Sequence, residues 1–399
     1  MFKKGNKRIY LDFAAATPVR KEVKKAMNQY WDKDFGNPGG LHQEGQIAKK
    51  AVSDARQKIA DLLGTRNDEI IFNSGGTESN NAAIWGVISK LEEEGTNIKD
   101  MHFITSKMEH PSVLNYFQHF EKRGAKLDLV ETDKNGQVDL NSLKELLRPN
   151  TILVSVMYVN NEIGTIQPIK EIIKIIRAYK KKELKNSEAQ FPLFHTDGAQ
   201  ALLYVSIDAG KLGADLISFD SQKIYGPKGM GLLYVRKGIK INPLISGGNQ
   251  ENSLRSGTEN VPLIVGFAKA LELATRERDA ETERLIKLRN YFLEEIIKKI
   301  PQVKLNGNLE NRLPNNLNLY IPANGNEFST IQLDAMGIAC GTKSACSKEK
   351  YSYVLKSLGK SDEEIKNSLR FTLGRTTTKK EIDRAIKAIE EIVKIANQS

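Results

Sequence analysis

One lysine stands directly ahead of a rigid, glycine-rich stretch. In "SQKIYGPKGMGLLYV", Lys223 is followed by Gly226, Pro227, Gly229 and Gly231, and then by apolar residues typical of a strand. Most lysines are ordinary surface residues, and a surface hairpin is one interpretation of this stretch. A lysine held still at such a turn can instead present its amine to a carbonyl group as a nucleophile. Other motifs in the sequence are needed to distinguish these two interpretations of Lys223.

Three other stretches place polar residues where expected strands end. In "NSGGTES", Gly75 and Gly76 end an expected strand and Thr77 opens a helix whose free N–H groups could bind phosphate, although a plain strand–helix turn fits equally well. Asp197 in "FHTDGAQ" could keep a heteroaromatic nitrogen protonated or could cap a helix. His110 in "MEHPS" could stack on a ring and shuttle protons, although lone histidines are more often structural. Together with Lys223, these groups are the equipment for pyridoxal 5'-phosphate.

The two cysteines stand in different surroundings. Cys346 lies in the polar, lysine-rich stretch "TKSACSKEK", which favours a reactive thiolate. Cys340 follows the more apolar "DAMGIA" and is expected to be packed. The spacing of these two residues, with no further Cys or His cluster, does not indicate a metal site. We therefore expect one reactive thiol, Cys346, and no bound metal.

Composition limits the compartment and the partners. The chain has 60 Lys and Arg against 49 Asp and Glu, a net charge of +11. Basic and acidic residues are mixed and no basic stripe with interleaved aromatics occurs, so direct nucleic-acid binding is not expected. Transient attraction of acidic proteins or tRNA stays open. No apolar run could span a bilayer, no signal peptide is recognisable, and two cysteines fit a reducing compartment. A cytoplasmic protein without membrane association is expected.

The pattern of elements predicts how these residues are positioned. Apolar residues at helical spacing over 42–63 predict an amphipathic helix, and strands then alternate with helices as far as residue 235. This alternation is typical of a mainly parallel sheet covered on both faces. From residue 261 onward, long charged helices and short strands follow. We expect a large domain over 15–260 and a smaller domain formed by 1–14 and 261–399.

A set of motifs in this order resembles the cysteine desulfurases of the NifS/IscS type, within aminotransferase class V. The motifs include "IYLDFAAATP", "SGGTESNN", "VNNEIGTIQPI", "HTDGAQ", "KIYGPKGMGLLYVR", "RSGTEN" and "LRFTLGRTTT". The resemblance implies the type I pyridoxal-phosphate transferase fold: α/β, with a mainly parallel seven-stranded sheet and a smaller α+β C-terminal domain. It also implies a homodimer that converts L-cysteine to L-alanine and keeps the sulfur as a persulfide. A sulfur-acceptor protein would then receive it, for iron–sulfur cluster assembly or tRNA thiolation.

The same resemblance assigns roles to individual residues. Lys223 would bond the cofactor's aldehyde, and Cys346 would attack the sulfur of the bound cysteine. The remaining cofactor contacts would be the ring partners His110, Asp197 and Gln200, the phosphate ligands Gly76, Thr77 and, from the other subunit, Thr258, and Asn161 beside the cofactor oxygen. Arg370 would clamp the substrate carboxylate, with Asn37 and Asn161 near the substrate. Alternatives are another class V enzyme, such as a selenocysteine lyase or an aminotransferase, and a non-catalytic sulfur-relay protein.

The chain departs from the family at three places. Family members usually carry Ser-x-His before the lysine, whereas this chain has Asp220, Ser221 and Gln222. Gln222 can still donate to phosphate, Asp220 would repel it if it points the same way, and Ser221 is the candidate replacement donor. The segment after Cys346 is shorter than usual. The resemblance also implies a C-terminal tail with which dedicated members dock a cluster scaffold; the given sequence ends soon after its last expected helix, so docking of a scaffold stays open as one of the two acceptor alternatives.

Overall fold

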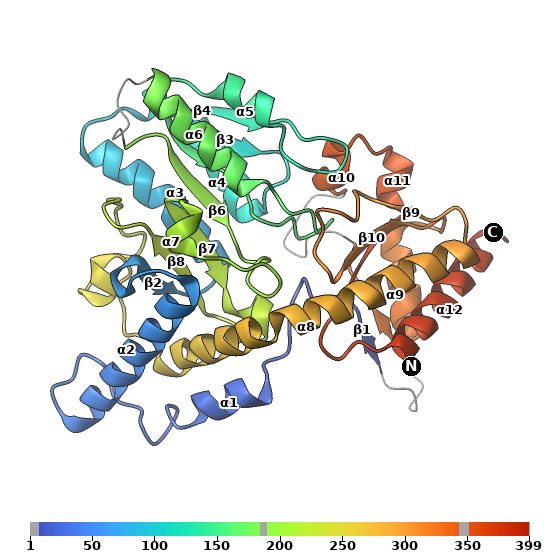
Figure 1. Ribbon diagram of the computed structural model, residues 1–399, viewed down its shortest axis with the longest axis horizontal. Helices are drawn as coiled ribbons and strands as arrows, with labels where there is room; N and C mark the ends of the chain where they lie inside the picture. The colour runs from blue at the N-terminus through green and yellow to red at the C-terminus, as the bar shows by residue number, and fades with distance from the viewer. Residues whose placement is uncertain (1–7, 184–189, 343–350, 399) are drawn as a thin grey trace.

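The computed structural model describes residues 8–183, 190–342 and 351–398, and a seven-stranded sheet forms its centre (Figure 1). The strands lie in the order β2-β8-β7-β6-β5-β3-β4, and the five strands from β7 to β4 run parallel to one another. β8 runs antiparallel to both β2 and β7. The bounds are β2 (Ile70–Asn73), β3 (His102–Ser106), β4 (Lys126–Val130), β5 (Thr151–Ser155), β6 (Leu193–Asp197), β7 (Leu216–Asp220) and β8 (Gly231–Val235). The predicted α/β class with a mainly parallel sheet is confirmed.

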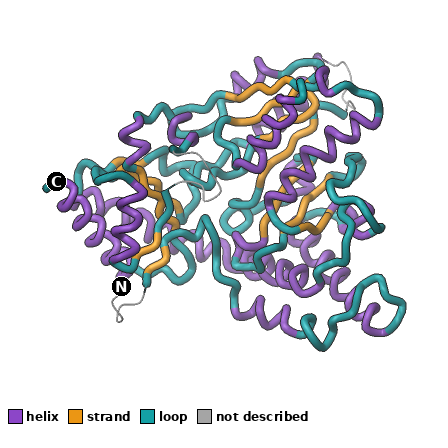
Figure 2. The backbone as a smooth tube through the Cα atoms, turned by 180° about the vertical axis from the view of Figure 1, so that it is seen from behind, coloured by secondary structure: helices purple, strands orange, loops and turns teal. Residues whose placement is uncertain are grey.

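Helices cover both faces of this sheet, as the view from behind shows (Figure 2). Side chains alternate along each strand, so Ile71 packs against one set of helices and its neighbours Ile70 and Phe72 against the other. One face is covered by α3 (Gly76–Glu93) and α4 (Pro111–Lys122). The opposite face is covered by α2 (Gln43–Leu63), α5 (Leu140–Leu146), α6 (Ile169–Glu183), α7 (Ala209–Leu212) and the first part of α8 (Val261–Lys299). Both faces are buried, which explains the continuous apolar runs in the strands.

A smaller domain with its own core contains the first strand and the last helix of the described chain (Figure 1). β10 (Asn316–Tyr320) pairs antiparallel with β12 (Ser368–Thr372) and β9 (Lys304–Leu305). β1 (Ile9–Tyr10) pairs with β11 (Ile338–Ala339). The other helices of this part are α9 (Asn326–Ala335), α10 (Tyr353–Ser357), α11 (Asp362–Lys366) and α12 (Lys379–Ala396). The remaining elements are α1 (Lys21–Asn28) and the 3-10 turns η1 (Asn67–Glu69), η2 (Ile98–Asp100), η3 (Ser221–Ile224) and η4 (Gln250–Ser253).

The long helix α8 contributes to both cores (Figure 1). Phe267 and Leu271 of its first half pack in the core of the large domain, whereas Phe292 and Ile296 of its second half pack in the core of the small domain. The expected division after residue 260 stays a prediction, and the first half of α8, which begins there, packs in the core of the large domain. The helix itself runs through the junction without a break and ties the two cores together.

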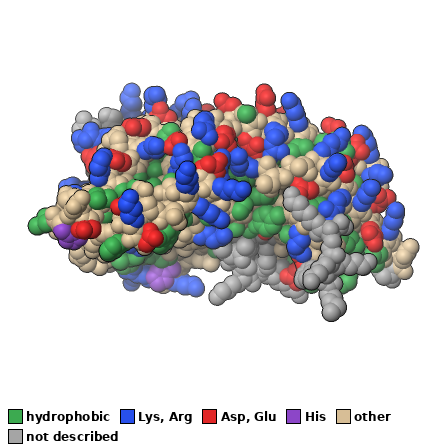
Figure 3. All heavy atoms as spheres, turned by 90° about the horizontal axis from the view of Figure 1, so that it is seen from below, with side chains coloured by type: hydrophobic (Ala, Val, Ile, Leu, Met, Phe, Trp, Pro, Cys, Tyr) green, Lys and Arg blue, Asp and Glu red, His purple; other side chains and the backbone are tan. Residues whose placement is uncertain are grey.

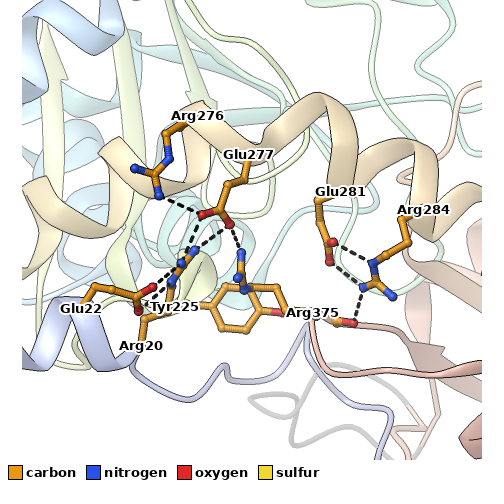
Figure 4. Close-up of polar contacts among 9 residues, drawn as sticks. Arg20, Glu22, Tyr225, Arg276, Glu277, Glu281, Arg284 and Arg375 are labelled. Carbon is orange, nitrogen blue, oxygen red and sulfur yellow. Dashed lines mark hydrogen bonds and ion pairs between the residues drawn. The ribbon is translucent and has the colours of Figure 1, made fainter.

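A cluster of charged side chains surrounds the middle of α8 (Figure 4). Glu277 accepts a hydrogen bond from Arg20 at 2.8 Å and pairs with Arg375, which follows β12. These contacts lower the pKa of Glu277 to about 2, and the hydrogen bond from Arg20 is the largest cause. The backbone N–H of Arg375 also donates to the Tyr225 hydroxyl, at 2.9 Å. Since Tyr225 directly follows η3, the cluster fixes the turn that carries Lys223 relative to the small domain.

Charged residues of both signs are interspersed on the face seen in Figure 3, where Lys and Arg stand beside Asp and Glu. Within the part of the chain that the structure describes, no helix is both long and apolar enough to cross a membrane.

Candidate active site

A cavity of about 270 Å³ lies where β6 and β7 end at their carboxyl termini. Ligands of open α/β sheets bind at this edge. Its lining includes nine of the residues that the sequence singled out: Gly76, Thr77, His110, Asn161, Asp197, Gln200, Gln222, Lys223 and Arg370. These residues come from both domains and are far apart in the sequence, and the fold brings them to one place.

Lys223 is held in the turn that follows β7. It lies in η3, and Tyr225 closes the turn with a left-handed φ of 62°. The Lys223 Nζ donates to the carbonyl oxygens of Ala14 and Ala15, each at 2.8 Å. Gln200 Nε2 donates to the same Ala14 oxygen at 3.0 Å. The amine therefore lies inside the cavity, fixed against the segment that follows β1.

Asp197 lies at the end of β6 and accepts two hydrogen bonds. Its Oδ1 accepts from the backbone N–H of Ala199 at 2.9 Å, and its Oδ2 accepts from Asn80 Nδ2 at 2.7 Å. The same Asn80 amide donates to Ser112 Oγ at 2.8 Å. The carboxylate is thus oriented by α3, and the chain of contacts continues to the N-terminus of α4.

His110 forms the N-cap of α4, and its tautomer follows from its contacts. The backbone N–H of Ser112 donates to His110 Nδ1 at 3.2 Å, so Nδ1 is an acceptor and the ring proton sits on Nε2. Burial is the main influence on the pKa of His110 and lowers it. This effect outweighs that of the Asp197 charge, which raises the pKa. The ring is therefore a neutral imidazole at physiological pH, suited to stacking on an aromatic ring.

Arg370 lies on β12 and is almost completely buried. Its Nη1 donates to the carbonyl oxygen of Asn161 at 2.9 Å, and its Nη2 pairs with Asp12 at 2.7 Å. Its Nε has no hydrogen-bond partner within the described residues. A Cβ on Gly341 would lie 2.9 Å from Nη2, so only glycine leaves room for the guanidinium there. An oriented guanidinium that lines the cavity is suited to bind a carboxylate.

The other predicted site residues lie outside this cavity or outside the described residues. Ser221 is buried against Gly226 and points away from the cavity, so it cannot replace the missing serine hydroxyl. The reason is geometric: Asp220 and Gln222 flank it in the turn, and both of those side chains line the cavity. Thr258 lies in a separate hollow beside Asn73 and Ser74. Asn37 is exposed and accepts a hydrogen bond from Gly39, and Cys346 lies outside the described residues.

Comparison with known proteins agrees with this geometry. The aminotransferase class V family model matches residues 9–385. Cysteine desulfurase IscS of Dictyoglomus turgidum is 46% identical over 96% of this chain and 94% of its own length. Cysteine desulfurase IscS of Methanosarcina thermophila is 44% identical over 99% of this chain and 94% of its own length. The chain belongs to the cysteine desulfurases of aminotransferase class V.

Solved structures place this cysteine desulfurase in the same fold. A NifS-like protein superposes with a TM-score of 0.89 at 34% identity, covering 97% of this chain and 100% of its own. SspA, whose structure was determined in complex with cysteine, superposes with a TM-score of 0.77 at 34% identity, covering 92% and 98% of the two chains. Enzymes of this family generally depend on pyridoxal phosphate.

Some residues of the desulfurase site were not singled out from the sequence. Asn80 and Ser112 line the cavity and connect Asp197 to His110. Asn80 lies three residues after Thr77 in the same helix and hence on the same face, which is a signal that could have revealed it. Asp12 pairs with Arg370, which is 358 residues away in the sequence, and no local sequence pattern predicts such a contact.

The residues present fit pyridoxal 5'-phosphate at the ring and at the aldehyde. The cavity holds an amine for the aldehyde, a carboxylate that two donors orient, and a neutral imidazole. The N-terminus of α3, with Gly76 and Thr77, offers free backbone N–H groups for the phosphate. Asp220 is the exception, because it brings a carboxylate to that same end.

Proposed function

We propose that this desulfurase binds pyridoxal 5'-phosphate, converts L-cysteine to L-alanine and takes up the sulfur as a persulfide on Cys346. One observation carries the proposal: a single cavity contains Lys223, Asp197 and Arg370, which are an amine, an oriented carboxylate and a buried guanidinium. When bound, the cofactor supplies an electron sink for the Cα of the substrate.

Lys223 and Asp197 would divide the chemistry at Cα. The Lys223 amine would carry the proton that leaves and later returns to the substrate. Its two carbonyl partners, Ala14 and Ala15, hold it in position without neutralising it. Asp197 would keep the ring nitrogen protonated, because its negative charge favours the pyridinium form. Gln200, beside Ala14, would contact the phenolic oxygen of the ring.

Arg370 would bind the substrate carboxylate. Its guanidinium is oriented by Asp12 and by the carbonyl of Asn161, and the residue lines the cavity. A carboxylate bound here would place Cα of the substrate in the cavity with Lys223. The related SspA was solved in complex with cysteine, which supports cysteine as the class of substrate.

Cys346 would accept the sulfur. The Cys346 thiolate would attack the substrate sulfur, so that an S–S bond forms, the C–S bond breaks and its electron pair stays on Cβ, which then takes up a proton. The segment that bears Cys346 begins from Gly341, whose backbone N–H and carbonyl both pair with Arg370. Beyond that segment, Ser352 Oγ donates to Glu162.

The enzyme would work as a homodimer that passes sulfur to an acceptor protein. Thr258 and Asn37 lie outside the cavity of their own chain, which supports their contribution to the site of a second copy. Trp31, Phe35 and Leu41 are exposed apolar residues near Asn37 in the sequence, and a second copy would cover them. The requirement for a free Cys346 thiol supports a reducing compartment, the cytoplasm.

The test is turnover of L-cysteine by the purified protein with pyridoxal 5'-phosphate and a thiol reductant. We expect sulfide and alanine in equal amounts, and an absorbance band at about 410–430 nm before substrate is added. Lys223→Ala should abolish both turnover and band while far-ultraviolet circular dichroism stays unchanged. Alanine production by Lys223→Ala at the wild-type rate would rule out the assigned role of this lysine.

A further inference from the structure

A carboxylate lies at the phosphate end of the cavity. Asp220 is the last residue of β7 and is 7% exposed. Its Oδ2 lies 3.5 Å from the position that a Cβ on Gly76 would occupy, and 4.0 Å from the corresponding position on Gly75. These two glycines form the start of α3, where an incoming phosphate would meet the free N–H groups. The carboxylate therefore stands beside the anion-binding end of that helix.

The neighbouring amide is already bonded to this carboxylate. The backbone N–H of Gln222 donates to Asp220 Oδ1 and its Nε2 donates to Asp220 Oδ2, both at 3.1 Å. Ser221 between them points away. Within the described residues, Asp220 makes its hydrogen bonds to Gln222 alone and forms no ion pair. The turn before Lys223 thus presents an acceptor to a phosphate where a donor would be expected.

The two cations that line the cavity, Arg370 and Lys223, donate hydrogen bonds to acceptors other than Asp220. His110 is neutral, and Asp197 brings a further carboxyl group to the cavity. Arg370 is paired with Asp12 on the small-domain side, and Lys223 is held by two backbone carbonyls. A dianionic phosphate placed beside Asp220 would therefore face a like charge in a partly buried site, where such repulsion is stronger than in water.

We propose that Asp220 makes the site bind phosphate-bearing ligands together with one proton, which bridges the carboxylate and a phosphate oxygen. The proton comes from an acid in solution, which is deprotonated; one O–H bond forms at the carboxylate or the phosphate, and this O–H donates to the oxygen of the other group. The inference rests on the proposed function, because it takes the cavity as the cofactor site. It makes Asp220 a residue that determines how tightly the cofactor's phosphate is held and how that affinity depends on pH.

The decisive measurement is ligand affinity as a function of pH, with protein from which bound cofactor has been removed. Pyridoxine 5'-phosphate is the probe, since it carries the phosphate but no aldehyde that could react with Lys223. Above the second phosphate pKa of about 6, we expect wild-type affinity to fall by roughly tenfold per pH unit. Asp220→Asn should remove this slope and bind the probe at least about tenfold more tightly at pH 8.

Two controls isolate the phosphate and the position. Pyridoxine, which lacks the phosphate, should bind wild type and Asp220→Asn within about twofold of each other. Asp139→Asn makes the same chemical change at the N-cap of α5, outside the cavity, and should leave every affinity unchanged. Calorimetry of the wild type in two buffers of different ionisation enthalpy should show uptake of about one proton on binding the phosphorylated probe. That measurement needs no variant.

Equal affinities for wild type and Asp220→Asn at pH 8, or no proton uptake by the wild type, would overturn the inference. Circular dichroism checks that the variant is folded, and Asp220→Ser provides a second variant. Failure of the proposed function has a different signature: pyridoxal 5'-phosphate would then bind neither the wild type nor Asp220→Ser at any pH between 6 and 9.

Discussion

The two cysteines illustrate how burial decides chemistry at the scale of one residue. Cys340 packs in the core of the small domain, and burial is the main cause that raises the pKa of its thiol to about 12. A thiol with that pKa is almost never a thiolate at pH 7–8, so it cannot be the nucleophile. The sequence context had predicted that Cys340 is packed, and this is confirmed. Cys346 is left as the one thiol that could accept sulfur.

We therefore expect Cys346→Ser to bind L-cysteine but to accumulate no persulfide. Cys340→Ser should keep most of the activity, at a stability cost of about 1 kcal/mol for a buried polar substitution. Mass spectrometry of the peptides after exposure to cysteine measures the added sulfur on each residue. An added sulfur on Cys340 with Cys346 unmodified would reverse the two roles.

Glu109 is a buried carboxyl group that makes stability depend on pH. Its Oε1 accepts from the backbone N–H of Met157 at 2.9 Å, whereas its Oε2 has no hydrogen-bond partner within the described residues. Burial is the main cause that raises its pKa from 4.5 to about 8. Because the folded state holds this proton more tightly than the unfolded state, its contribution is complete below pH 4.5 and is lost as pH rises to about 8.

Glu109→Gln should remove this dependence. The amide keeps an oxygen for Met157 and cannot ionise, so the variant should gain roughly 1–3 kcal/mol over the wild type at pH 8 and little at pH 5. Denaturant unfolding at the two pH values measures the difference. A stability gap that stays the same at both pH values would contradict the assignment of the proton to Glu109.

At the scale of the elements, the local hydrophobic pattern predicts a helix or strand where all of its apolar residues pack into the same core. Each central strand is a short apolar run, and each covering helix has one apolar face, so their order could be predicted from periodicity. Two features of the elements could not be predicted from periodicity. The first is α8, whose apolar residues keep helical spacing while their surroundings change from one core to the other between Leu271 and Phe292. The second is the direction of Ser221, which depends on how η3 turns after β7.

The junction at the middle of α8 offers a test of how firmly the elements are joined. Glu277 pairs with Arg20 ahead of α1 and with Arg375 after β12, whereas Glu281 pairs with Arg284 in the same helix. Glu277→Gln should lower the free energy of unfolding by about 1–2 kcal/mol at pH 7, and Glu281→Gln by less. The contacts lower the pKa of Glu277 to about 2, so its contribution is present above pH 4.5 and is lost as pH falls toward 2.

Denaturant unfolding of both variants at pH 7 and pH 3 checks this prediction. The penalty of Glu277→Gln should shrink at pH 3, because the unfolded wild type binds a proton at this carboxyl group below pH 4.5, whereas the folded protein, with a pKa of about 2, still largely lacks that proton. Equal penalties for Glu277→Gln and Glu281→Gln at pH 7 would mean that the links to Arg20 and Arg375 add nothing to the fold.

At the scale of the whole molecule, the site depends on contacts that span most of the chain. Motifs at strand ends could be predicted to meet, because parallel strands bring their carboxyl ends to one edge of the sheet. The contacts that hold these motifs in place could not be predicted. Ala14 accepts a hydrogen bond from Lys223, which is 209 residues away in the sequence, and Asp12 pairs with Arg370, which is 358 residues away. Such pairings follow from how the two domains are joined, which no stretch of local sequence records.

A mixing experiment tests whether the functional molecule is a dimer with shared sites. Thr258 lies outside the cavity of its own chain, which supports the proposal that its hydroxyl contacts the phosphate bound by a second copy. Thr258→Glu would place a negative charge beside that phosphate and should be inactive, as should Lys223→Ala. In a mixed dimer, however, the subunit with an intact Lys223 receives an intact Thr258 from its partner. Refolding the two variants together in equal amounts should therefore restore about a quarter of wild-type activity, since half the dimers are mixed and each has one complete site. No recovery, with mixed dimers verified by two different affinity tags, would show that Thr258 does not act across the interface.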